Sequence, residues 1–165
     1  MAFGLRKERS IDEGGRVLQK RNSGGFTLIE LLIVVAVIGI IAAIAIPNLL
    51  NAIDQSKQKR TMAELRSVGT AVESYAVDQN FYPVATTAPT LAALVTPFYV
   101  KKVPTEDGWS NILVVDSATT GYTVSSAGKD GTAGGCVAGT VTTLFNQDIC
   151  FSNGRFVQFP LGRQQ

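Results

Sequence analysis

The sequence predicts an α+β fold in which one long N-terminal helix packs on a small antiparallel β-sheet. Residues 26–46 form an almost uninterrupted apolar run, and apolar residues continue at helical spacing after it. From Asp107 onward, β-rich runs alternate with turn residues, which is typical of short strands. A helix backed by one sheet is a stable two-layer arrangement for a chain of 165 residues. The sequence therefore divides into residues 1–25, 26–46, 47–80 and 81–165.

The apolar run from Phe26 to Ile46 is long enough to cross a bilayer, which takes about 20 helical residues. Its one charged residue is Glu30. A carboxylate in hydrocarbon costs about 2.5–3.5 kcal/mol on insertion scales, so an acid at this position requires a partner. In one interpretation, Glu30 belongs to an ordinary anchor and reaches toward the membrane surface. In the other, it pairs with an amine.

A cut between Gly25 and Phe26 would supply that amine. The new α-amine of Phe26 would lie about one helical turn from Glu30. The pair would form within one chain or between neighbouring chains. Pairing between chains would fix the axial offset of a helical polymer, because each acid stays unsatisfied until the next amine arrives in register.

Residues 1–25 are polar and basic, and we expect them to be a leader that is removed. Their net charge of +3 favours the cytoplasmic side of the membrane and places the C-terminal part outside. The alternative is a conventional secretory signal whose cleavage follows Ala43-Ile44-Ala45. The first residue of the mature chain, Phe26 or Ile46, distinguishes the two.

The helix is predicted to continue past the apolar run to about Gln79. Pro47 removes a backbone donor and favours a kink, and Gly39 weakens the helix two turns earlier, so we expect this segment to stretch or unwind in a filament. Residues 47–80 form the amphipathic half, whose apolar residues we place in the core. These residues are Leu49, Ile53, Leu65, Val68, Val72 and Tyr75.

Residues 81–165 are predicted to form a globular head. The segment before Pro83 should end the long helix, and a short helix is expected over residues 86–97, with Leu91, Leu94 and Val95 facing inward. Strands are expected at residues 112–115, 122–124, 140–145 and 155–159. The dipeptide Asn153-Gly154 predicts a tight turn beside the last strand.

The composition argues against several classes of protein. The sequence contains no histidine, which leaves hydrolase triads and most zinc sites without support. The net charge of +2 becomes −1 once residues 1–25 are set aside, so a global nucleic-acid footprint is absent. Asp130 and Asp148 could form a carboxylate pair, but no nucleophile or oxyanion donor accompanies them. We expect that the protein is not an enzyme.

The two cysteines, Cys136 and Cys150, both lie downstream of the apolar run. An even pair in an exported segment is typical of a disulfide, which contributes about 3 kcal/mol for a loop of this size. The alternative is a pair of buried free thiols.

The segment Gly25-Phe26-Thr27-Leu28-Ile29-Glu30 resembles the processing site of type IV prepilins and of the pseudopilins of type II secretion. The resemblance extends from the end of the leader over the apolar helix to Pro47. It implies a type IV pilin-like fold, cleavage after Gly25, N-methylation of Phe26 and a role for Glu30 in assembly.

By this resemblance, the chain is the structural subunit of a type IV pilus-like filament and polymerises through its apolar helix. The implied partners are a prepilin peptidase and methylase, an assembly ATPase and an inner-membrane platform. The precursor would lie in the inner membrane with its head outside the cytoplasm, and the product would be a cell-surface pilus or a periplasmic pseudopilus. One alternative is the major pseudopilin of a type II secretion system. Another is a minor tip pilin that binds a ligand such as DNA, although Arg155 and Arg163 are too few for a strong phosphate signature.

The polar loops of the head are similar in order to the calcium-binding loops of the major pseudopilin. The similar segments are residues 107–111, 126–135 and 148–149. The resemblance implies that Asp130 and Asp148 are calcium ligands, since calcium takes oxygen donors. The sequence departs from that pattern at Gly108 and Ser110, which flank Trp109, and by an insertion at residues 137–147. A plain β-turn at Asp130 is the alternative.

Overall fold

The computed structural model describes residues 25–161, so all of the predicted leader except Gly25 lies outside the described residues. The elements are α1 (Leu28–Gln79), α2 (Ala88–Val95), β1 (Val114–Ala118), β2 (Gly121–Ser126), β3 (Thr140–Thr142), β4 (Ile149–Ser152) and β5 (Arg155–Pro160). The chain divides into two compact units, Met1–Ala43 and Ile44–Gln165, and each is described by itself.

The described part of the first unit is the apolar start of α1. Its large apolar side chains are exposed, from 47% for Val34 to 83% for Leu28. By length and composition, this helix is able to cross a membrane. A helix suits that setting because it satisfies its own backbone hydrogen bonds.

In the second unit, α1 continues through Pro47 and ends at Gln79, where its end was predicted. Asn80 follows with a positive φ of 62°, a left-handed conformation that terminates helices. Near Pro47, the side chain of Asn48 donates to the carbonyl of Ile44 at 3.0 Å. The kink at Gly39 and Pro47 stays a prediction.

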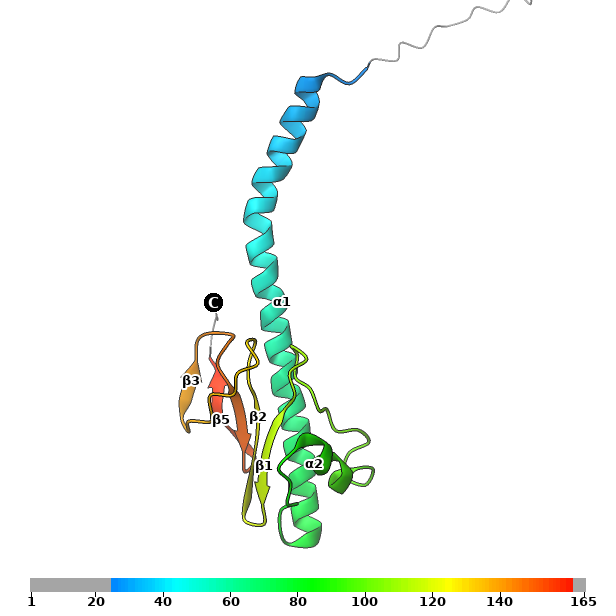
Figure 1. Ribbon diagram of the computed structural model, residues 1–165, viewed down its shortest axis with the longest axis vertical. Helices are drawn as coiled ribbons and strands as arrows, with labels where there is room; N and C mark the ends of the chain where they lie inside the picture. Colours follow the sequence, from blue (N-terminus) through cyan, green and yellow to red (C-terminus); the bar gives the residue numbers. More distant parts are fainter. Residues whose placement is uncertain (1–24, 162–165) are drawn as a thin grey trace, which may run out of the picture. The chain divides into compact units, whose positions relative to one another are not determined.

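The five strands form one sheet in the order β1-β2-β4-β5-β3 (Figure 1). Neighbouring strands are antiparallel except β3 and β5, which run parallel. The α+β class is confirmed, and the sheet is mixed rather than wholly antiparallel. Strand β4 was not predicted. Its four residues lie directly between Asp148 and the Asn153-Gly154 turn, and so short a run gives no clear strand pattern. That turn, Asn153-Gly154, joins β4 to β5 with positive φ at both residues, as predicted.

The core lies between the C-terminal half of α1, α2 and the sheet, which Figure 1 shows alongside that half of the helix. Its most deeply buried side chains come from all three parts: Leu65, Val68, Val72, Leu91, Val95, Leu113, Val124 and Ile149. Three predicted core residues are instead exposed: Leu49 at 61%, Ile53 at 43% and Leu94 at 40%. Leu49 and Ile53 precede Asp54, the first buried residue of α1, because the head covers the helix only from that point.

Gly69 is buried on α1 where the ring of Phe151 from β4 lies against the helix, and a Cβ at Gly69 would overlap that ring. We predict that Gly69→Ala lowers the free energy of unfolding by about 1–3 kcal/mol, because a packed ring must move. Urea unfolding of the full chain in detergent measures this loss. The control, Ser67→Ala, changes an exposed residue two positions away and should stay within about 0.5 kcal/mol of wild type. Equal unfolding midpoints for both variants would contradict the prediction.

Candidate functional site

The carboxylate of Glu30 is held by the residue just before α1. Thr27 donates to Glu30 Oε2 twice, from its N–H at 2.9 Å and from its hydroxyl at 2.8 Å. The N–H of Glu30 donates in return to Thr27 Oγ1 at 3.3 Å. This reciprocal pair is a capping box, and a negative charge is favoured at this end of a helix. In the uncleaved chain, the acid therefore already has polar partners.

The residues of the predicted cleavage site, Gly25 and Phe26, precede the helix and are exposed, Phe26 at 76%. Cleavage between them would leave Thr27 in place and put the new α-amine one residue before it. The structure thus places Gly25, Phe26 and Glu30 at one helix end. Thr27 was missed by sequence reasoning, although threonine three residues before glutamate at a helix start is a recognisable cap signal.

Asp54 joins α1 to two loops of the head. Its side chain accepts from Trp109 Nε1 at 3.1 Å and from Lys129 Nζ at 2.8 Å. Burial raises the pKa of Asp54, but the hydrogen bonds from Lys129 and Trp109, together with the charges of Lys129 and Lys57, outweigh burial and lower it. Asp54 is therefore a charged anchor for both loops. Sequence reasoning missed it because its partners lie 55 and 75 residues away along the chain.

The loop over residues 107–111 lies directly on the backbone of α1. Gly108 donates its N–H to the hydroxyl of Thr61 at 2.9 Å, and a Cβ at Gly108 would overlap the carbonyl of Lys57. The buried carboxylate of Asp107 shapes the loop by accepting from the N–H groups of residues 109 and 111 and from the hydroxyl of Ser126. The glycine before Trp109, a departure from the resembled loop, is explained by this close approach to the helix.

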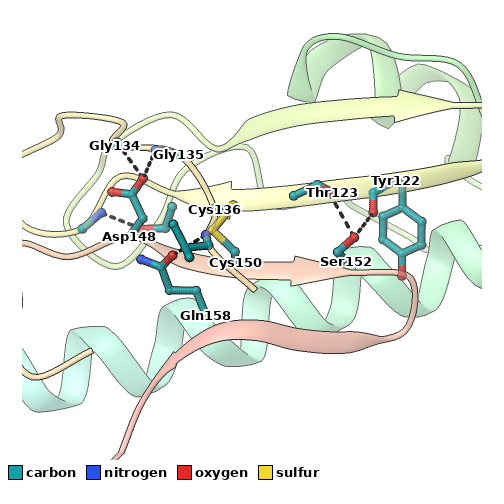
Figure 2. Close-up of a disulfide and its surroundings, with 12 residues drawn as sticks. Tyr122, Thr123, Gly134, Gly135, Cys136, Asp148, Cys150, Ser152 and Gln158 are labelled. Atoms are coloured by element: carbon teal, nitrogen blue, oxygen red, sulfur yellow. Dashed lines mark hydrogen bonds between the residues drawn. A yellow bond between two sulfur atoms is a disulfide. The ribbon is translucent and has the colours of Figure 1, made fainter. Parts of the chain in front are cut away.

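The disulfide between Cys136 and Cys150 is confirmed. Figure 2 shows that it links the glycine-rich loop, which we define as residues 130–139, to strand β4. Because β4 lies between β2 and β5, the disulfide fastens this loop to the middle of the sheet.

Asp148 also holds the glycine-rich loop. Its Oδ2 accepts from the N–H of Gly134 at 2.7 Å and from the N–H of Gly135 at 2.9 Å (Figure 2). Burial raises the pKa of Asp148, the two amide hydrogen bonds oppose this rise, and the charge of Asp130 adds to it. The side chain of Asp130 is exposed and accepts from the N–H of Thr132, as in a turn capped by aspartate.

Both predicted calcium ligands accept hydrogen bonds from backbone amides, and calcium binding stays a prediction. Within residues 25–161, no group of three or more His, Cys, Asp or Glu residues is placed to hold a metal ion. Oδ2 of Asp148 faces two amide hydrogens, where a cation requires free lone pairs. Asp107, the first acid of the resembled order, uses both carboxylate oxygens within the protein.

Arg155 lines a groove of about 500 Å³ between α1 and the β4–β5 turn. Arg66 and Glu73 line the same groove, and the guanidinium of Arg66 lies 5.5 Å from the centre of the Phe156 ring. The glutamate offsets one of the two positive charges, so the groove is a poor match for a polyphosphate chain.

Two family models match the chain. Residues 20–46 match the prokaryotic N-terminal methylation motif, and residues 48–143 match type II secretion system protein G. The second match covers more than half of the sequence. The chain belongs to the type II secretion system protein G family. The resemblance to pilins and pseudopilins is thereby confirmed.

Relatives of this protein G family member include type II secretion proteins and a type IV fimbrial protein. The type II secretion system core protein G of Pseudomonas aeruginosa is 32% identical over 133 residues, covering 72% of this chain and 92% of the relative. The protein of that name from Vibrio cholerae is 32% identical over 145 residues, covering 78% and 94%. The type IV major fimbrial protein FimA of Dichelobacter nodosus is 56% identical over 54 residues, covering 33% and 35%. No solved structure matches the chain.

The lowered pKa of Asp54 predicts a pH dependence of folding. A carboxyl group whose pKa is lower in the folded than in the unfolded chain contributes stability above its unfolded pKa, about 3.9, and loses it as the pH falls through the folded pKa. We predict that Asp54→Asn lowers stability at neutral pH and weakens the further loss below about pH 4. Urea unfolding at a series of pH values measures both effects.

The control is Asp116→Asn, which removes an exposed carboxylate from β1. It should leave both the neutral stability and the acid dependence close to those of wild type. If Asp54→Asn were as sensitive to acid as wild type, Asp54 would not be the charged anchor described above.

Proposed function

We propose that the chain is a structural subunit of a type II secretion pseudopilus, cleaved after Gly25, N-methylated at Phe26 and polymerised through the apolar part of α1. The observation that carries this proposal is a methylation motif leading directly into an exposed apolar helix in a member of the protein G family. In the precursor, the inner membrane covers this helix, with the head outside the cytoplasm. In the filament, other copies cover it.

The extent of the family matches favours a pseudopilus over a surface pilus. The secretion relatives align with 72% and 78% of the chain, whereas the fimbrial relative aligns with 33%. The protein G model itself matches residues 48–143, which include much of the head. A cell-surface pilus is the second candidate, supported by the 56% identity to FimA. A tip subunit that binds DNA has less support, because Glu73 shares its groove with Arg66 and Arg155.

Assembly in this proposal is an exchange of partners at Glu30. Before processing, its carboxylate accepts from Thr27. After cleavage, the α-amine of Phe26 on a neighbouring copy competes for the carboxylate, and its full positive charge adds an attraction between opposite charges that the neutral Thr27 donors lack. A prepilin peptidase and methylase, an assembly ATPase and an inner-membrane platform are the partners required. The protein itself catalyses no reaction.

We predict that Glu30→Gln and Glu30→Ala chains are processed normally but fail to polymerise, because neither side chain carries the charge that matches an α-amine. Comparing the filament and membrane fractions of lysed cells measures the loss, which we expect to be at least about tenfold for an ionic contact of this kind. The matched control is Glu106→Gln, an exposed glutamate of the head, which should assemble as wild type does. Normal filament yield from the Glu30 variants would overturn the role assigned to this acid.

We also predict that the mature chain begins with N-methylated Phe26. Mass spectrometry of the mature N-terminus distinguishes this start from Ile46. Gly25→Val should retain residues 1–25, because the added side chain alters the residue at the scissile bond. A mature start at Ile46 would instead indicate a conventional signal peptidase.

A further inference from the structure

We propose that the glycine-rich loop of this head is closed by the Cys136–Cys150 disulfide together with hydrogen bonds to Asp148 and Gln158. Closure then requires oxidation and no divalent cation. This inference is independent of the proposed function, since it concerns the head of a subunit whether the filament is a pilus or a pseudopilus.

The first observation behind this proposal is the orientation of the Asp148 side chain. Both N–H groups that it accepts converge on one oxygen, Oδ2, at 2.7 and 2.9 Å. Amide hydrogens carry partial positive charge, so a cation at this oxygen would lie against two like charges and would have to displace them. Asp148 as a whole residue is 5% exposed. It therefore serves as an acceptor for the loop backbone rather than as a metal ligand.

Gln158 on β5 holds the next part of the loop. Its Oε1 accepts from the N–H of Val137 at 2.8 Å, and the N–H of Gly139 donates to the carbonyl of Val157 at 2.8 Å. The loop then leads into β3, which lies at the edge of the sheet and pairs with β5. The position of this three-residue edge strand thus depends on how the loop before it is held.

The disulfide and the hydrogen bonds join the same two segments. Gly135 directly precedes Cys136, and Asp148 lies two residues before Cys150, which is fully buried in β4. The covalent link therefore keeps the Asp148 carboxylate beside the loop amides at high effective concentration. Without the link, a glycine-rich segment would lose considerable conformational entropy on closing.

Closure couples the loop to the redox state of its surroundings. In exchange with a disulfide reagent such as oxidised glutathione, one S–S bond forms between Cys136 and Cys150 and the S–S bond of the reagent breaks. Two protons and two electrons pass from the cysteine thiols to the sulfurs of the reagent, which leave as two thiols. An oxidising compartment thus completes the head, and a reducing one leaves the loop open.

Hydrogen exchange of the full chain in detergent tests the proposal at the loop itself. The amides of Gly134, Gly135 and Val137 should show the same protection in EDTA and in millimolar calcium chloride. Reduction of the disulfide, or the Cys136→Ser and Cys150→Ser double variant, should lower this protection at least about tenfold.

Two variants of Asp148 separate an acceptor from a metal ligand. Asp148→Asn should keep the protection of Gly134 and Gly135, because an amide oxygen still accepts both N–H groups. Asp148→Ala should lower the protection of Gly134 and Gly135 about tenfold, because no acceptor remains. Asp130→Asn, the control on the other predicted ligand, should behave as wild type.

Three results would overturn the proposal. The first is protection that disappears in EDTA and returns with calcium. The second is loss of protection in both Asp130→Asn and Asp148→Asn, as expected for a pair of cation ligands. The third is protection that survives unchanged in the double cysteine variant.

Discussion

The structure depends on the exposed apolar surface of the first part of α1. The first part of α1 exposes a continuous series of leucine, isoleucine and valine side chains, from Leu28 onward. An exposed apolar surface of this size requires a bilayer or other protein chains around it. Three features accompany this surface: a match to the N-terminal methylation motif, an acid at the helix start, and a head packed on the C-terminal half of the same helix.

The head meets α1 through two chemically different contacts. Around Leu65, Val68 and Val72, the contact is apolar and fully buried. Nearer the apolar run, it consists of hydrogen bonds and an ion pair from Asp54 and Thr61 to the head's loops. Polar contacts of this kind fix geometry through direction and distance, whereas apolar burial supplies most of the stabilisation. The polar contact therefore determines where coverage of the helix begins.

Much of the fold follows from local signals in the sequence. The apolar run, the end of α1 before Pro83 and the Asn153-Gly154 turn all depend on residues close together in the chain, and all three are correct. The errors concern contacts between distant segments. Leu49 and Ile53 have helical spacing that fits a core, but spacing cannot reveal where the head stops. Strand β4 is too short to give a periodic pattern.

The candidate site also combines residues that local sequence indicates with residues that only the tertiary structure brings together. The resemblance proposes Gly25, Phe26 and Glu30 from one short motif, and their roles stay predictions. Two cysteines suffice to predict the disulfide, which the structure confirms. The partners of Asp54 and the amide donors facing Asp148 depend on tertiary structure alone. For Asp148, residue type and order suggest a cation ligand, and only the direction of its hydrogen bonds indicates an acceptor for backbone amides.

The Thr27 cap has a consequence for the energetics of filament growth. Its hydroxyl and N–H both donate to Glu30 Oε2, so the acid of a single subunit already has hydrogen bonds before any neighbour arrives. If a neighbouring α-amine replaces these donors during elongation, the free energy gained is the difference between two sets of bonds to one carboxylate. It is not the full cost of an unpaired carboxylate in hydrocarbon.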